Sequence, residues 1–220
     1  TWGAGGSTRR KTVELVARIQ DEIELTAMAH LSCVGSMGAE LGAARDQPDG
    51  YQPPPGALRF ANELVELIEP SRRFCIGAAC YPETHPRAKS PEHDLAMLVQ
   101  KVRAGADFLI TQLFFDDADY FAFVARGRAA GISVPIVPGI MPIVSAASIR
   151  RMTTLCGARI PDELGRALDA AADDDEPTLE MGVEWAIAQC RELLRRGAPG
   201  IHFYTLNRSP ATRRIYEQLF

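Results

Sequence analysis

Apolar residues recur along this chain in short continuous runs, and longer stretches with helical spacing separate them. The runs at 27–33, 74–80, 107–115, 134–140 and 200–205 predict β-strands. They lack the alternation of apolar and polar positions that marks a sheet with one face in water. Continuously apolar strands are typical of a parallel sheet covered by helices on both faces.

The stretches between the runs predict helices, each with one apolar face. Those faces comprise Leu15, Val16, Ile19 and Ile23 after a candidate cap at Ser7 or Thr8; Leu95, Leu98 and Val102; and Leu179, Val183, Ile187, Cys190 and Leu194. Ser90 and Pro91 form an N-cap followed by proline at the first helical position. The stretch 116–131 starts acidic and ends in glycine. Arg195 and Arg196 lie in the last turn of the last long helix, and Gly197 follows them as a C-cap.

Alternating strands and helices predict either a doubly wound sheet or a (β/α)8 barrel. No G-x-G-x-x-G follows any of the strands, so nothing supports a Rossmann dinucleotide site. Polar residues follow several strands, as at the catalytic end of a barrel: His30, Tyr81, Gln112, Asn207 and Arg208. We therefore expect a (β/α)8 TIM barrel of the α/β class.

Composition and charge indicate one globular domain and argue against nucleic-acid and membrane binding. With 220 residues, 46% apolar and 24% charged, the chain is long enough for one large globular domain, which we place at 1–220. The net charge of −4 argues against a nucleic-acid binder and gives no reason for attraction to an anionic membrane. No apolar run could cross a bilayer and no signal peptide is visible, so we expect a cytoplasmic protein. Because the chain starts at Thr1 without methionine, we expect it to be part of a longer translation product.

Cysteine and histidine patterns give no sign of a metal site. The five cysteines (Cys33, Cys75, Cys80, Cys156 and Cys190) form no C-x-x-C pair, and we interpret them as small buried hydrophobes in a reducing compartment. The four histidines show no zinc-ligand spacing with them. The acidic run 169–177 predicts a solvated connection that also begins the last helix, and 50–56 predicts a proline-rich loop.

Gln112 is the anomaly in the pattern, because this amide stands inside the apolar run 107–115. Burying an amide without a partner costs on the order of a few kcal/mol. Its partner must be another protein group, a water molecule or a ligand, and the strand alone does not decide which.

Six segments, in order, carry a resemblance to a known family. They are "TWGAGGSTRRKT" (1–12), "AHLSC" (29–33), "YPETHPRAKSPEHDL" (81–95), "KVRAGADFLITQLFFD" (101–116), "IVPGIMPI" (136–143) and "HFYTLNRS" (202–209). Together they resemble the catalytic domain of methylenetetrahydrofolate reductases. The resemblance implies a (β/α)8 barrel that holds FAD and passes a hydride from NADH or NADPH to 5,10-methylenetetrahydrofolate, giving 5-methyltetrahydrofolate. It also implies ping-pong kinetics, a place in one-carbon metabolism and methionine biosynthesis, and a homo-oligomer.

The chain departs from the family's pattern in two places. The family's first barrel strand carries a glutamate, its proposed general acid, in an F-E-F-F-P-P-like run that has no counterpart here. The segment near 36–50 is shorter than the family's helix and strand, which end in an A-L-R-G-D-like motif. We expect residues to be missing from both places, so that the chain lacks the first strand and part of one βα unit.

The resemblance assigns two sets of site residues. The flavin-binding set is Thr1, His30, Arg45, Asp46, Tyr81, His85, Ala88, Asp94 and Lys101. The substrate-binding set is Gln112, Leu206 and Arg208, and no residue is assigned to a metal. Asp46 and Gln112 are the catalytic candidates, Asp46 as a carboxylate that stabilises the 5-iminium cation and Gln112 as an amide beside the flavin ring. Arg208 would bind the anionic folate.

Each of these residues also has a plainer interpretation. Gln112 could bond a neighbouring strand, Asp46 could stabilise a turn, and Lys101 could lie on an ordinary surface helix. For the whole chain, the alternatives are a catalytically inactive flavin- or folate-binding barrel with a regulatory role, or a different barrel enzyme. A Schiff-base aldolase has little support, because no strand end carries a lysine.

Overall fold

The structure is a computed structural model that describes residues 61–71, 75–171, 175–205 and 210–220. It divides into two units, Thr1–Phe74 and Cys75–Phe220. The described part of the first unit is helix α2 (Ala61–Ile68), which buries Leu64 and Val65, and the 3₁₀ turn η1 (Glu69–Ser71). The predicted strand at 27–33 and the helix before it lie outside the described residues.

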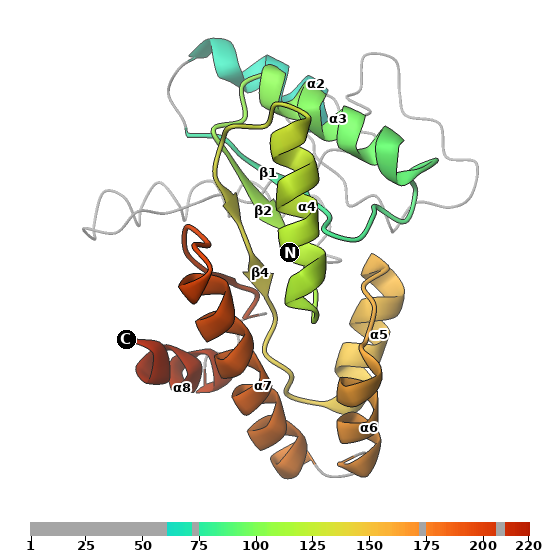
Figure 1. The fold of residues 1–220 in the computed structure, drawn as a ribbon, viewed down its shortest axis with the longest axis vertical. Helices are drawn as coiled ribbons and strands as arrows, with labels where there is room; N and C mark the ends of the chain where they lie inside the picture. The colour runs from blue at the N-terminus through green and yellow to red at the C-terminus, as the bar shows by residue number, and fades with distance from the viewer. Residues whose placement is uncertain (1–60, 72–74, 172–174, 206–209) are drawn as a thin grey trace, which may run out of the picture. The chain divides into compact units, whose positions relative to one another are not determined.

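All described strands belong to the second unit, and every pairing among them is parallel, as predicted. Strands β1 (Gly77–Cys80), β2 (Phe108–Thr111) and β3 (Ile136–Val137) form one sheet in that order. Strands β4 (Gly139–Ile140) and β5 (His202–Phe203) form a second. Pro138 separates β3 from β4, so one extended segment belongs to both sheets (Figure 1).

Helices connect the strands and complete the second unit. They are α3 (Pro91–Arg103), α4 (Asp117–Ala129), α5 (Ala146–Cys156), α6 (Asp162–Ala170), α7 (Asp175–Arg195) and α8 (Pro210–Leu219). Helix α3 follows β1 and α4 follows β2, each leading to the next parallel strand, which is the βαβ arrangement predicted from the alternating pattern.

The structure contains caps at the predicted helix boundaries. Ser90 begins α3, and its hydroxyl accepts a hydrogen bond from the His93 N–H at 3.2 Å. Asp116 caps α4 in the same way, accepting from the Ala118 N–H at 2.9 Å. Gly197 follows α7 with φ +89°, a left-handed conformation that glycine adopts without strain. The acidic run 169–177 spans the end of α6 and the start of α7.

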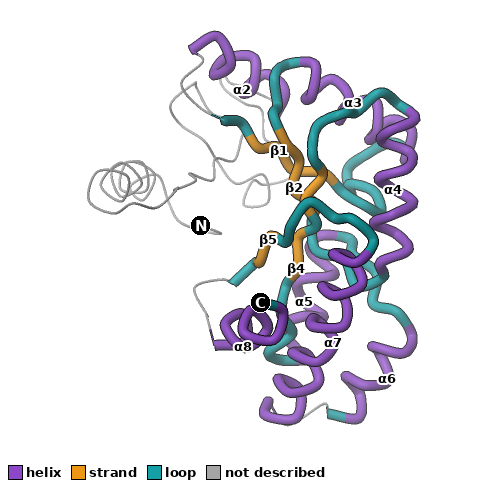
Figure 2. Tube along the Cα trace, turned by 60° about the vertical axis from the view of Figure 1, so that its left-hand side comes forward, coloured by secondary structure: helices purple, strands orange, loops and turns teal. Residues whose placement is uncertain are grey.

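Two apolar cores hold this unit together. In the larger, the buried face of β1 and β2 packs against α3, α4, α7 and α8, and Leu109, Cys190 and Ile215 are fully buried. The tube in Figure 2 shows α3, α4 and α7 on one side of the strands. In the smaller core, Leu113, Phe115 and Met141 pack against α5 and α6.

Burial alternates along β1 and β2, contrary to the continuously buried strands that the sequence predicts. Ala78 and Cys80 are buried, whereas Gly77 and Ala79 on the opposite face are exposed. A closed ring of strands is not seen among the described residues, so the (β/α)8 barrel over 1–220 stays a prediction.

Two sequence interpretations need correction. Strand β2 ends at Thr111, so Gln112 follows the strand instead of standing inside it. The apolar run continues to Phe115 because Phe114 fills one core while Leu113 and Phe115 fill the other. Cys80, Cys156 and Cys190 are buried as predicted, but Cys75 is exposed because it precedes β1.

Candidate functional site

The carboxyl ends of parallel strands meet at one edge of a sheet, and here that edge is rich in polar groups. Tyr81 directly follows β1 and Gln112 directly follows β2. The Gln112 N–H donates to the Cys80 carbonyl at 2.7 Å, which joins the two strand ends. We therefore take this edge as the candidate site.

Thr111, the last residue of β2, links the two sheets at the same edge. Its buried hydroxyl accepts a hydrogen bond from the Gly139 N–H at 2.8 Å, and its carbonyl accepts one from the Tyr204 hydroxyl at 2.8 Å. Gly139 is required there, because a Cβ at that position would collide with the Thr111 carbonyl and lie 2.6 Å from the Tyr204 ring. Burial raises the pKa of the Tyr204 phenol, which therefore stays a neutral donor.

The loop after β1 and helix α3 bring together several residues that the family resemblance assigns to the flavin. The His85 N–H donates to Asp94 Oδ2 at 2.8 Å, and the rings of Tyr81 and His85 meet edge to face with centroids 4.6 Å apart. The Ala88 N–H donates to the His85 carbonyl at 2.8 Å. The structure thus places Tyr81, His85, Ala88 and Asp94 in one neighbourhood.

Lys101 reaches the same neighbourhood from two turns further along α3. Its Nζ donates to the carbonyl of Ala79, in β1, at 2.6 Å. Burial lowers the pKa of Lys101, and electrostatic interactions with Cys80 and Asp94 oppose that shift. Asp94 and Lys101 lie seven residues, or about two turns, apart on α3 and so share one face of the helix, and the ammonium group points back at the sheet.

Two arginines from later elements hold this loop in place. Arg126, in α4, donates to the Pro82 carbonyl at 3.1 Å. The backbone N–H of Arg159 donates to Glu83 Oε1 at 2.7 Å, while its guanidinium pairs with Asp116 and Asp119 at 2.9 Å each. Burial raises the pKa of Glu83, and the Arg159 N–H opposes the shift. The loop is thereby tied to α4 and to the connection between α5 and α6.

Gln112 is only partly buried, which removes the energetic problem that its sequence context raised. Its side-chain Oε1 accepts a hydrogen bond from the Leu113 N–H at 3.0 Å. An amide oxygen with one partner retains a second lone pair, and the amide nitrogen carries two donors. The side chain therefore keeps hydrogen-bonding capacity at the strand ends.

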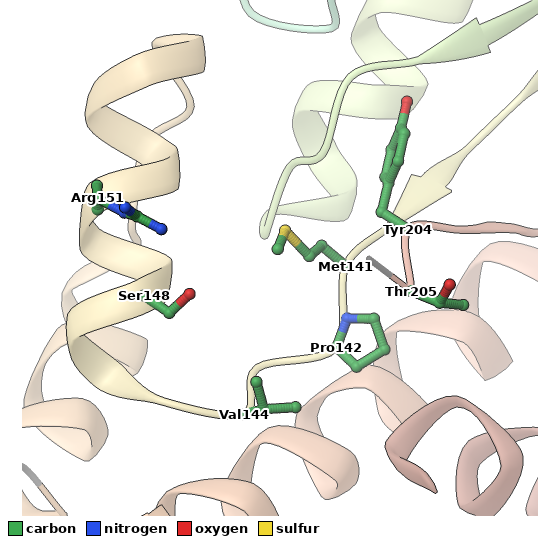
Figure 3. A pocket seen from close by; sticks show the side chains of 7 residues that line it. All are labelled: Met141, Pro142, Val144, Ser148, Arg151, Tyr204 and Thr205. Carbon is green, nitrogen blue, oxygen red and sulfur yellow. The ribbon is translucent and has the colours of Figure 1, made fainter. Parts of the chain in front are cut away.

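A cavity of about 280 Å³ opens where β4 and β5 end. Its walls are formed by Met141, Pro142, Val144, Ser148, Arg151, Tyr204 and Thr205. Figure 3 shows Ser148 and Arg151 on α5 facing the strand-end residues across the cavity. Gly182 lets α7 approach this region closely, because a Cβ there would lie 2.7 Å from the Ile143 Cβ.

The sequence reasoning missed this cavity because it did not predict α5. The signal was present in the apolar spacing of Ala146, Ile149 and Thr153, which line the buried side of that helix. Of the assigned site residues, Thr1, His30, Arg45, Asp46, Leu206 and Arg208 lie outside the described residues.

A parallel α/β protein with polar side chains at the carboxyl ends of its strands belongs to a structural class that binds ligands at that edge. Comparison with known proteins identifies the family within the class. The family model described as methylenetetrahydrofolate reductase matches residues 1–48 and 42–220. The chain belongs to the methylenetetrahydrofolate reductase family.

Curated relatives agree with this result. The 5,10-methylenetetrahydrofolate reductase of Escherichia coli is 36% identical over 232 residues, covering all of this chain and 78% of the relative. Methylenetetrahydrofolate reductase 1 of Schizosaccharomyces pombe is 35% identical over 239 residues, and methylenetetrahydrofolate reductase (NADH) 1 of Arabidopsis thaliana is 37% identical over 237. This chain spans 40% of each of these two longer relatives.

A solved structure supports the α/β fold. The match is to an uncharacterised protein from Clostridium thermocellum, described as binding two copies of 5-methyl-5,6,7,8-tetrahydrofolic acid. It has a TM-score of 0.53 and 18% identity, and covers 74% of this chain and 59% of the other. Across the described parts of the chain, no helix is both long and apolar enough to span a membrane.

Proposed function

We propose that this chain reduces 5,10-methylenetetrahydrofolate to 5-methyltetrahydrofolate with NADH or NADPH as the reductant and FAD as the cofactor. We also propose that its strands belong to a (β/α)8 barrel. The parallel βαβ units and the family membership support both statements. The Arabidopsis relative is named for NADH, which makes NADH the first reductant to test.

One observation carries the proposal. Gln112, which the resemblance assigns to the substrate, follows the strand next to the one that leads into Tyr81, His85, Asp94 and Lys101. Its N–H is bonded to the carbonyl of Cys80, the last residue of that neighbouring strand. Residues assigned to two different ligands therefore meet at one edge, as a transfer between those ligands requires.

The donor set in the α3 neighbourhood fits FAD. Lys101 has used one of its three N–H donors on Ala79 and can offer the others to a phosphate. Asp94 retains acceptor capacity for ribityl hydroxyl groups, because His85 uses only one of its lone pairs. Tyr81 and His85 supply ring surfaces for stacking.

The chain's own residues would bind and orient the reactants. When bound, FAD supplies the hydride relay between the reductant and the folate. Gln112 would hydrogen-bond whichever partner lies against it, and an amide suits both because it donates and accepts. Asp46 would stabilise positive charge on the substrate, and Arg208 would bind its anionic end. If both partners use one position in turn, the kinetics are ping-pong.

A spectroscopic titration tests the proposal. Purified protein should be yellow, lose its visible absorption on anaerobic addition of NADH or NADPH, and regain it when 5,10-methylenetetrahydrofolate is added. Protein that binds FAD or folate but fails to complete this cycle would instead be the inactive binding barrel. Protein that binds neither would contradict both functions.

A further inference from the structure

We propose that Glu83 is a positioning residue for the flavin, and that it acts by fastening the flavin loop, residues 81–90 between β1 and α3, to Arg159. The inference rests on the proposed function, because it takes FAD as the cofactor. It adds two residues that the family resemblance does not assign to any ligand, and whose role is to hold the loop that carries Tyr81 and His85.

The flavin loop is anchored from outside on both sides of Glu83. Before it, Pro82 is buried, and its carbonyl accepts a hydrogen bond from the Arg126 guanidinium of α4 at 3.1 Å. After it, Pro86 packs against Gly157, which ends α5 with φ +78°. A Cβ on Gly157 would lie 2.9 Å from the Pro86 Cγ, so the approach needs glycine there. The loop therefore lies against both α4 and the end of α5.

Glu83 makes the side-chain attachment between these two anchors. Its Oε1 accepts a hydrogen bond from the Arg159 N–H at 2.7 Å, in the connection between α5 and α6. The Arg159 guanidinium lies 2.9 Å from Asp116 and 2.9 Å from Asp119, at the start of α4. One residue thus joins the flavin loop to two later elements, and its bond to Glu83 has a carboxylate acceptor, which strengthens it.

The location of this attachment favours a role in positioning over a role in global stability. The Arg159 side chain is 53% exposed, and exposed ion pairs contribute little to the free energy of unfolding. Residues 81–90 contain no helix or strand, so their conformation depends on such local contacts. Tyr81 and His85 stand two residues either side of Glu83, and their rings meet with centroids 4.6 Å apart. A loop held in this conformation spares the ligand the cost of ordering it.

The rate of FAD release tests the inference without requiring turnover, and the rise in flavin fluorescence on release measures it. Glu83→Ala should release FAD faster than the wild type by about fivefold or more, because the bond to the Arg159 N–H is lost. Glu83→Gln should restore slow release, since an amide oxygen can accept the same N–H. Arg159→Ala keeps that N–H but loses both ion pairs, so it should have a smaller effect and add nothing to Glu83→Ala. Arg150→Ala, which breaks the exposed pair with Asp169, is the control and should release FAD as the wild type does.

Hydrogen exchange in the apoprotein gives a second measurement that is independent of FAD. Residues 81–95 should exchange faster in Glu83→Ala than in the wild type, with the urea midpoint of unfolding unchanged.

The outcomes separate the inference from the proposed function. If the wild type holds FAD and Glu83→Ala releases it at the same rate, the inference alone fails. Release from Glu83→Gln as fast as from Glu83→Ala would also overturn it, because the hydrogen bond would then not be the cause. Faster release with a parallel fall in the urea midpoint would overturn it in favour of general destabilisation. If the wild type binds no FAD, the proposed function fails and the inference with it.

Discussion

Asp117 begins α4 with its Oδ1 buried and without a hydrogen-bond partner. Burial, with smaller contributions from Glu192 and Asp116, raises the pKa of its carboxyl group to about 6, against the opposing effects of Gln189 and Arg196. Because the folded protein then holds this proton more tightly than the unfolded chain, deprotonation costs stability. This loss of stability is absent below the pKa that Asp117 has in the unfolded chain. It grows between about pH 4 and 6 and stays constant at higher pH.

We expect Asp117→Asn to stabilise the protein by about 1 kcal/mol near pH 7.5, after allowance for the partial exposure of the group. Near pH 4 the gain should vanish, because the carboxyl group is then already neutral in both states. Urea unfolding at the two pH values measures the difference. Asp162→Asn, at the exposed first position of helix α6, is the control and should give no gain at either pH.

Gln112 shows at the residue scale what the sequence could and could not predict. The parallel pattern predicted that Gln112 and Tyr81 lie at the catalytic edge of neighbouring strands, although it placed Gln112 inside the apolar run 107–115. The partial burial of Gln112 and its bond with the Leu113 N–H do not follow from that pattern, because they depend on where β2 stops. The sequence predicts that the strand continues through the apolar residues 113–115, but in the structure their side chains fill the two cores.

At the scale of elements, prediction succeeded where a local signal marks a boundary. Helices α3 and α4 have side-chain caps, and α7 has a long apolar face. Neither α5 nor α6 has a capping hydrogen bond from a side chain, and both escaped prediction. The cavity was missed with them, since α5 forms one of its walls. Side chains from distant segments meet there only after the chain has folded.

A second prediction concerns Gly139, where the two sheets meet. In Gly139→Ala the new methyl group would meet the Thr111 backbone and the Tyr204 ring, and backbone cannot move aside as a flexible side chain can. We expect a loss of roughly 1–3 kcal/mol of unfolding free energy from overpacking.

Gly165→Ala is the matched control, because nothing lies within 4 Å of a Cβ built there, in the middle of α6. That substitution should stabilise the helix by up to about 1 kcal/mol. Equal effects of the two substitutions on the urea midpoint would show that Gly139 is not needed for the approach of β5 to β2.

At the scale of the molecule, the proposed function depends on one edge formed by the carboxyl ends of parallel strands. Lys101 and Asp94 reach it from α3, Gln112 from β2, and the cavity at the ends of β4 and β5 continues it. The proposed folate reduction takes place at that edge.

The most direct test follows the two half-reactions separately in Gln112→Ala by stopped-flow absorbance. We predict that FAD content is unchanged and that reoxidation of the reduced flavin by 5,10-methylenetetrahydrofolate slows by about tenfold or more, as expected when a buried ligand group loses its hydrogen-bond partner. Gln218→Ala, at an exposed position of α8, should behave as wild type. A variant that sheds FAD or unfolds while folate still reoxidises the remaining flavin at the wild-type rate would contradict the assignment of Gln112 to the substrate.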